Sequence, residues 1–212
     1  MRLFIVLIVS LSLACAGELE SARDRQDRAA LAKLAAGSPY QIALARSYLS
    51  EVALELRDKR EARIAAEAGI VAARDAIAAD PKKAEYHRLL GTLCGQVIPA
   101  DPLAGFQHGK CAKQEIEKAL SLDPKSALAW VSSGVGKYYL PPMLGGGLDL
   151  ALKDFEKAAA LNPKLPEAWL WIGLTHRKAG RNPEARKALE KAQSLNPQRI
   201  WIKQQLEKTP VS

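Results

Sequence analysis

The sequence predicts an all-α protein built as a stack of helical hairpins, an α-solenoid. Its 212 residues are rich in Ala, Leu, Lys and Glu, and no segment shows the alternating pattern of a strand. An acidic or amide residue followed by proline closes a helix four times, with the prolines 43, 39 and 34 positions apart. These closures are Asp80-Pro81, Asp123-Pro124, Asn162-Pro163 and Asn196-Pro197.

The clearest hairpin is residues 166–197, where large and small apolar residues recur at helix-pairing positions. Trp169, Ile172 and Gly173 share one face of a first helix, and Leu189 faces back from a second. Small residues at such positions let the two helix axes approach, and a proline ends the second helix. This stretch resembles the tetratricopeptide repeat (TPR), whose standard length is 34 residues. The resemblance implies about four hairpins and a scaffold that binds another protein or a peptide.

The amino terminus, residues 1–16, predicts a secretory signal, with Arg2 followed by an apolar run and a small-residue end. The run is shorter than the ~20 residues that a membrane-spanning helix needs. Cleavage after Ala16 would leave an exported chain, periplasmic or secreted, that starts at Gly17. Alternatively, Cys15 carries the lipid of an envelope lipoprotein, which would bring membrane contact. Ser12 stands where such proteins usually have Leu.

The remaining chain divides into six segments. Residues 17–37 predict a polar lead-in helix, and Ser38-Pro39 has the chemistry of a helix start. Residues 198–212 predict a capping helix with a polar outer face, followed by a tail. The hairpins between them are a degenerate first one at 38–81, TPR-like repeats at 84–124 and 127–163, and the repeat at 166–197.

The two middle repeats exceed the standard length by nine and five residues. In each, all of the excess falls between the paired helices, so both insertions are expected at the same edge of the solenoid. Insertions on one face of a repeat array often mark its binding side. Tolerated surface padding is an equally good explanation, because long loops cost little free energy.

Cys94 and Cys111 are the cysteines that remain after cleavage, and they flank the nine-residue insertion. An even count in an exported chain favours a disulfide. A metal site using these cysteines with His87 and His108 is the rival explanation. His87 and Cys94 would be about 10 Å apart along one helix, which suits a tetrahedral ion poorly, so no metal is expected.

Charge and motifs exclude several functions. The net charge is +8, but no nucleic-acid-binding motif accompanies it, so a solvated basic surface is expected and no nucleic acid. No paired carboxylates, Ser–His–Asp set or complete metal set is present, which predicts a protein without enzymatic activity and without a cofactor.

The TPR resemblance assigns an inner groove to defined positions of each first helix. The apolar centre with its edge forms the expected partner-binding groove: Leu128, Val131, Val135, Tyr138, Leu170, Leu174 and Arg177. The remaining groove positions are Glu85, Arg88, Thr92, Gly95 and Glu167. The set of Lys and Asn residues that clamps chaperone carboxylates in other TPR domains is absent.

The most unusual local sequence is the Tyr138–Gly147 loop, YYLPPMLGGG, which includes Tyr139. As structure, its prolines end one helix and its glycines form a flexible connection to the next helix. As function, its two tyrosines and methionine make a contact patch. The loop also loosely resembles that of the accessory T-component of TRAP-type transporters. The alternative function is therefore a ligand-binding accessory of a solute transporter, which would require a closed, deep cavity.

Overall fold

A computed structural model describes residues 17–211 of the chain, and all regular structure in that range is helical. The predicted signal at 1–16 and the last residue lie outside the described range. After a helical segment at residues 17–24, the elements are α2 (Arg28–Lys33), α3 (Pro39–Glu55), α4 (Lys59–Ala79), α5 (Ala84–Val97), η1 (Pro102–Ala104), α6 (Gly105–Leu122), α7 (Ala127–Tyr139), η2 (Pro142–Leu144), α8 (Leu148–Leu161), α9 (Pro166–Lys178), α10 (Asn182–Leu195) and α11 (Ile200–Glu207).

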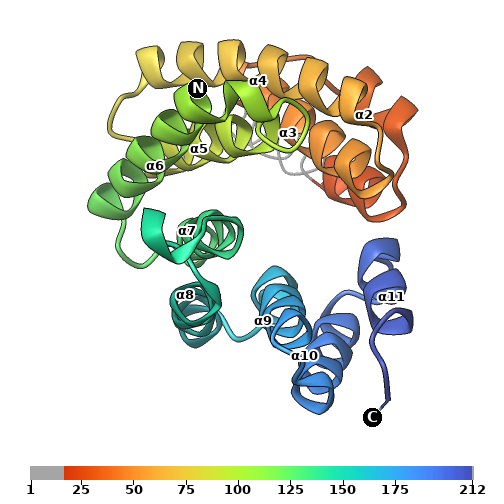
Figure 1. Ribbon diagram of the computed structural model, residues 1–212. Coiled ribbons are helices and arrows are strands. Elements are labelled where there is room, and N and C mark those ends of the chain that lie inside the picture. Colours follow the sequence, from red (N-terminus) through yellow and green to blue (C-terminus); the bar gives the residue numbers. More distant parts are fainter. Residues whose placement is uncertain (1–16, 212) are drawn as a thin grey trace, which may run out of the picture.

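Within the described residues, four helical hairpins form the array, as the sequence predicts. The pairs are α3 with α4, α5 with α6, α7 with α8 and α9 with α10, and α11 packs on α10 at the end. Neighbouring hairpins follow one another along a curved path (Figure 1). The all-α solenoid is therefore confirmed.

Within the hairpins, glycines allow the close helix contacts that the spacing predicts. A Cβ atom at Gly173 would lie 2.6 Å from Cγ of Leu189, and one at Gly134 would lie 2.4 Å from Cε1 of Phe155. Both partner side chains are fully buried. Any larger residue at these positions would therefore push the paired helices apart.

The helix-closing prolines take part in a hydrogen bond that repeats along the array. The indole Nε1 of Trp130 and that of Trp169 each donate to the carbonyl of the proline six positions earlier, at 2.9 Å. In the second hairpin, Nε2 of His87 lies 3.0 Å from the carbonyl of Pro81. His87 therefore contacts the carbonyl of the preceding helix-closing proline, as the tryptophans do in the next two repeats.

The lead-in differs from the single polar helix predicted for residues 17–37. It consists of two short helices, because Gln26 adopts a left-handed conformation (φ 56°) and Asp27 caps α2 by accepting from the backbone N–H of Ala30. Leu19 and Leu31 are buried in the same apolar cluster as the first hairpin. The lead-in is therefore part of the core.

The predicted helix start at Ser38 is confirmed, because a capping box formed by Ser38 and Gln41 begins α3.

Both insertions lie between paired helices, as predicted, but they differ in form. The longer one contributes η1 and lengthens α6 to 18 residues, whereas α10 has 14. The shorter one forms the loop around η2 and does not lengthen the helices beside it. α7 has the same length as α9, and α8 has the same length as α10.

The two ends of the array meet. In Figure 1 the blue α11 lies beside the red and orange segments at the start of the described chain. Side chains join these segments directly: Arg23 donates to Glu167 at 2.9 Å, and Arg199 donates to the carbonyl of Arg23 at 3.0 Å. In most repeat arrays a repeat contacts only its neighbours. Here contacts over 144 and 176 positions of sequence close the solenoid into a ring.

Candidate functional site

Aromatic side chains of α7, α8 and α11 gather around Trp171 of α9, at the base of the Tyr138–Gly147 loop. The ring of Trp171 lies 5.4 Å from that of Tyr138, 5.8 Å from that of Phe155 and 6.1 Å from that of Trp201, measured between centroids. Burial raises the pKa of Tyr138. These contacts fix the base of the loop to the helices beneath it.

The outer part of the same loop carries exposed apolar side chains. We call four of them the loop patch: Tyr139, Leu140, Met143 and Leu144, which are 65%, 42%, 89% and 66% exposed. An open depression of about 310 Å³ lies beside the patch, lined in part by Tyr138, Pro142 and Lys178. The ammonium of Lys178 lies 4.1 Å from the Tyr138 ring centroid and donates to the carbonyl of that tyrosine at 3.1 Å. Aromatic residues and methionine are enriched at protein interfaces, so this surface suits contact with a protein.

The predicted partner-binding groove is only partly open. Leu170 and Leu174 are 3% and 4% exposed because they pack in one cluster with Ile202 of α11. Val131 is buried in the cluster of the third hairpin, and Val135 is half-buried against it. These four groove positions are therefore covered, in whole or in part, by other parts of the chain.

The polar groove positions are also engaged. Arg177 donates to the backbone carbonyl of Gln205 at 3.0 Å and thereby holds the carboxyl-terminal helix. Arg88 is buried and forms an ion pair with Glu85, with the closest atoms 2.5 Å apart. Thr92 lies 3.1 Å from the hydroxyl of Ser132 on α7. Leu128 stays 39% exposed, and a Cβ atom placed at Gly95 would have open space around it.

A buried carboxylate explains two departures from the TPR pattern in the third hairpin. Ser133 and Lys137 both donate to Asp154 on α8, each at 2.6 Å, and Asp154 is 5% exposed. The ion pair compensates the cost of burying the carboxylate. This cluster therefore serves helix pairing.

Cys94 and Cys111 form a disulfide in the structure, as predicted, with a Cα–Cα distance of 6.0 Å. It joins the end of α5 to the beginning of α6 across the longer insertion. Nδ1 of His87 lies 2.7 Å from Glu115, so this ring is engaged within its own hairpin. Among residues 17–211, no group of three metal-binding side chains comes together.

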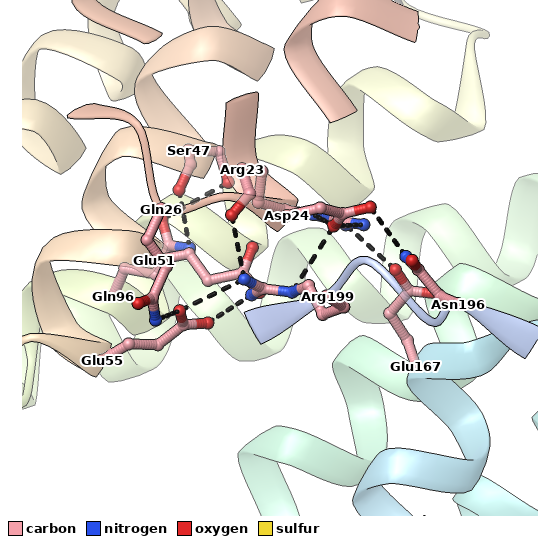
Figure 2. A network of polar contacts seen from close by, with 10 residues as sticks. All are labelled: Arg23, Asp24, Gln26, Ser47, Glu51, Glu55, Gln96, Glu167, Asn196 and Arg199. Carbon is pink, nitrogen blue, oxygen red and sulfur yellow. Dashed lines mark hydrogen bonds and ion pairs between the residues drawn. The ribbon is translucent and has the colours of Figure 1, made fainter. Parts of the chain in front are cut away.

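A network of polar side chains joins the two ends of the array, and Figure 2 shows it from close by. We call it the end-to-end network. Its members are Arg23, Asp24, Glu51, Glu55, Glu167, Asn196 and Arg199. They come from the segment 17–24, from α3, from the first turn of α9 and from the connection between α10 and α11.

Arg199 is the centre of this network and is 3% exposed. Its Nη2 donates to Glu51 at 2.9 Å, and it forms a two-atom contact with Glu55. Its Nε lies 3.6 Å from the carboxylate of Asp24, which accepts from the amide of Asn196 at 2.7 Å. The guanidinium therefore faces acidic groups of both α3 and the amino-terminal segment.

The pKa values of two members of the network, Glu55 and Arg23, are shifted. Burial raises the pKa of Glu55 to about 7, and Glu51 adds to the rise while Arg199 opposes it. For Arg23, burial lowers the pKa, but the carboxylates of Glu51 and Glu167 outweigh this and raise it well above its ordinary value. The ring closure thus depends on carboxylates held close to buried guanidinium groups.

Sequence reasoning missed the end-to-end network, apart from Glu167 as a groove position. No repeat motif assigns a role to Arg23 or Asp24, and Arg199 lies in a connection between helices. The available signal was weak: an Arg-Asp pair in a lead-in whose Leu19 and Ala22 lie three apart, as on one helix face.

Comparison with known families gives two matches. The profile described as regulator of microtubule dynamics protein 1-3 matches residues 17–140. A tetratricopeptide repeat profile matches residues 166–199, which agrees with the repeat at 166–197. No curated protein sequence matches the chain significantly.

Solved structures resemble the whole chain in fold. A thermophilic TPR protein of Thermus thermophilus is 19% identical, with 95% of each chain covered and a TM-score of 0.60. YrrB, described as a TPR protein with an unusual peptide-binding site, is 20% identical over 92% of this chain and 87% of its own, with a TM-score of 0.44. At these identities the likeness concerns the fold alone.

Proposed function

This chain belongs to the family of regulator of microtubule dynamics proteins 1-3, and from that membership and its TPR fold we propose that it is an exported, non-enzymatic scaffold that binds another protein. The loop patch is the observation that carries the proposal. Its four apolar side chains are 42% to 89% exposed beside an aromatic base and a lysine. Large exposed apolar side chains gathered at one place are typical of protein-binding surfaces.

The partner contacts the loop patch and the adjoining open part of the groove, where Leu128, Val135 and Tyr138 remain accessible in whole or in part. Aromatic anchors in such surfaces often cost about 2 kcal/mol or more of binding free energy when they are truncated. The longer insertion adds two more exposed apolar side chains, Leu103 and Phe106, which are 96% and 94% exposed. Exposed apolar residues on both insertions support a binding role for the insertions over surface padding.

Export rests on the signal-like residues 1–16 and is supported by the disulfide, because such bonds persist in oxidising compartments. No helix within residues 17–211 has the length and apolar character to cross a membrane. Intact-mass measurement tests the export proposal. A mature chain that starts at Gly17 is expected, and a diacylated chain that starts at Cys15 would place the protein on a membrane surface instead.

The binding proposal is tested by comparing two variants in pull-downs from the cell envelope fraction of the source organism. Tyr139→Ala with Met143→Ala should lose the captured partner. Lys187→Glu with Lys191→Glu, which changes basic residues of α10, should retain it and change mainly the salt dependence. Circular dichroism confirms that both stay helical. Loss of the partner by the charge-reversed variant alone would show that the basic surface is the binding face.

The family description and the basic charge favour a second candidate, binding to microtubules. The net charge of +8 suits an acidic surface. This candidate requires a chain located in a compartment that contains tubulin. Co-sedimentation with microtubules that weakens steeply as the salt concentration is raised would favour it over the exported scaffold.

The transporter-accessory alternative has less support. A ligand-binding role would need an enclosed cavity, whereas the best-formed depressions on the described surface are open to solvent. The larger, of about 530 Å³, is lined by charged side chains of α4 that include Arg60, Arg63 and Glu67.

A further inference from the structure

The helical segment at residues 17–24 presents one apolar face to the array. Leu19 and Ala22 are each 1% exposed, whereas Glu18 and Glu20 on the other side of the same segment are exposed. Leu19, Ala22 and Arg23 stand at positions i, i+3 and i+4, which share one face of a helix. The segment therefore binds the array as an amphipathic helix binds a groove.

The segment contacts the first helices of the hairpins at both ends of the array. The guanidinium of Arg23 lies 4.8 Å from the ring centroid of Tyr48 on α3. The same guanidinium donates to Glu167 at 2.9 Å, and Glu167 is a groove position of the last repeat. One side chain thus bridges the first helices of the first and last hairpins.

Two of the polar contacts between the segment and the rest of the array are ion pairs, and two are hydrogen bonds, from the amide of Asn196 to Asp24 and from Arg199 to the carbonyl of Arg23. Arg23 pairs with Glu167, and Asp24 lies 3.6 Å from the guanidinium of Arg199. Buried ion pairs contribute little net free energy, because desolvation offsets their attraction. Being part of the same chain gives the segment a high effective concentration at this site. A second helix with the same chemistry can therefore compete for the site.

We propose that the inner side of the ring closure is a helix-binding site that the chain's own residues 17–24 occupy, and that its external ligand is an amphipathic helix of another protein. That helix carries a Leu, a small residue and an Arg at i, i+3 and i+4. Residues 17–24 then regulate binding, because a partner helix must displace them. This inference rests on the proposed function as a protein-binding scaffold.

The experiment uses a labelled synthetic peptide of residues 17–27 as the probe and the full-length chain as the receptor. The chain variant Leu19→Asp with Arg23→Ala changes the occupant and leaves Tyr48, Glu51, Glu167 and Arg199 intact. Fluorescence anisotropy should show that the peptide binds this variant at least about tenfold more tightly than it binds the unchanged chain. A peptide with the same two substitutions should not bind.

Glu20→Ala, on the exposed side of the segment, is the matched control and should behave as the unchanged chain. Leu19→Ala alone is the milder variant, and it should give an intermediate affinity if the double variant loses helicity. Equal peptide affinity for the unchanged chain and the folded variants would overturn the proposal, as would no binding to any of them. Because this assay needs no natural partner, its failure leaves the loop-patch pull-down as an independent test of scaffold function.

Discussion

At the residue scale, the carboxyl group of Glu55 connects ring closure to pH. Its side chain is buried beside Arg199 and accepts from the amide of Gln26 at 2.9 Å. Burial raises its pKa from 4.5 to about 7. The folded chain therefore holds the proton more tightly than the unfolded chain does, and protonation favours the folded state.

We expect this stabilisation to be full below pH 4.5 and to be lost as pH rises through 7. Raising the pH from about 5 to about 8 should lower the free energy of unfolding by an amount on the order of 2 kcal/mol. In Glu55→Gln the contribution from this site should be absent. Urea unfolding at both pH values, with Glu18→Gln as the exposed control, measures the difference. The same pH dependence in Glu55→Gln would assign it to another group.

A second residue-scale prediction concerns two glycines of α7. Gly134→Ala should destabilise the protein by about 2 kcal/mol, because the new methyl group would lie 2.4 Å from Phe155. Gly136 has open space around a Cβ position, so Gly136→Ala should stabilise the helix by up to about 1 kcal/mol. Thermal unfolding of the two variants provides the comparison. Equal effects would mean that α7 and α8 are not closely packed at Gly134.

At the element scale, most of the hairpins could be predicted because their signals are local. Trp169, Gly173 and Leu189 lie within one repeat, and their spacing alone defines which helix faces meet. The disulfide could be predicted for the same reason, since both cysteines flank one insertion. The break at Gln26 could not, because a left-handed conformation at a glutamine has no sequence signature.

The disulfide makes the second hairpin a distinct unit of stability. It links residues 17 positions apart, and in the chain-entropy model a loop of this size contributes about 3 kcal/mol. Cys94→Ala with Cys111→Ala should lower the free energy of unfolding by about this amount. A reductant should lower the unfolding midpoint of the unchanged chain and leave that of the double variant unaffected. Equal midpoints for the unchanged chain with and without reductant would contradict the expected contribution.

At the scale of the whole molecule, ring closure was beyond sequence reasoning. Arg23 and Arg199 are 176 positions apart, and no motif relates a lead-in to a capping helix. For the same reason, the sequence did not determine which of the predicted groove positions are exposed. Whether Leu170 and Leu174 are open depends on how α11 packs, which the repeat pattern does not determine.

The central position of Arg199 in the ring closure gives a prediction about shape. Arg199→Ala removes the pairs with Glu51 and Glu55 and leaves those carboxylates without their partner. The ends should separate, and small-angle X-ray scattering should report a larger radius of gyration than for the unchanged chain. Lys203→Ala, at an exposed position of α11, is the control. An unchanged radius of gyration in folded Arg199→Ala would show that the remaining contacts, which include Arg23 with Glu167 and Asn196 with Asp24, suffice to close the ring.

The contact between the segment 17–24 and α11 also affects how the array unfolds. An open array of repeats unfolds first at its terminal units, because a terminal repeat has an interface with only one neighbour. Here the first and last units contact each other through Asp24, Asn196 and Arg199. Unfolding of either end therefore also removes these contacts from the other end. The hairpins should therefore unfold in a single cooperative step, and the terminal helices should exchange their amide hydrogens nearly as slowly as the middle ones.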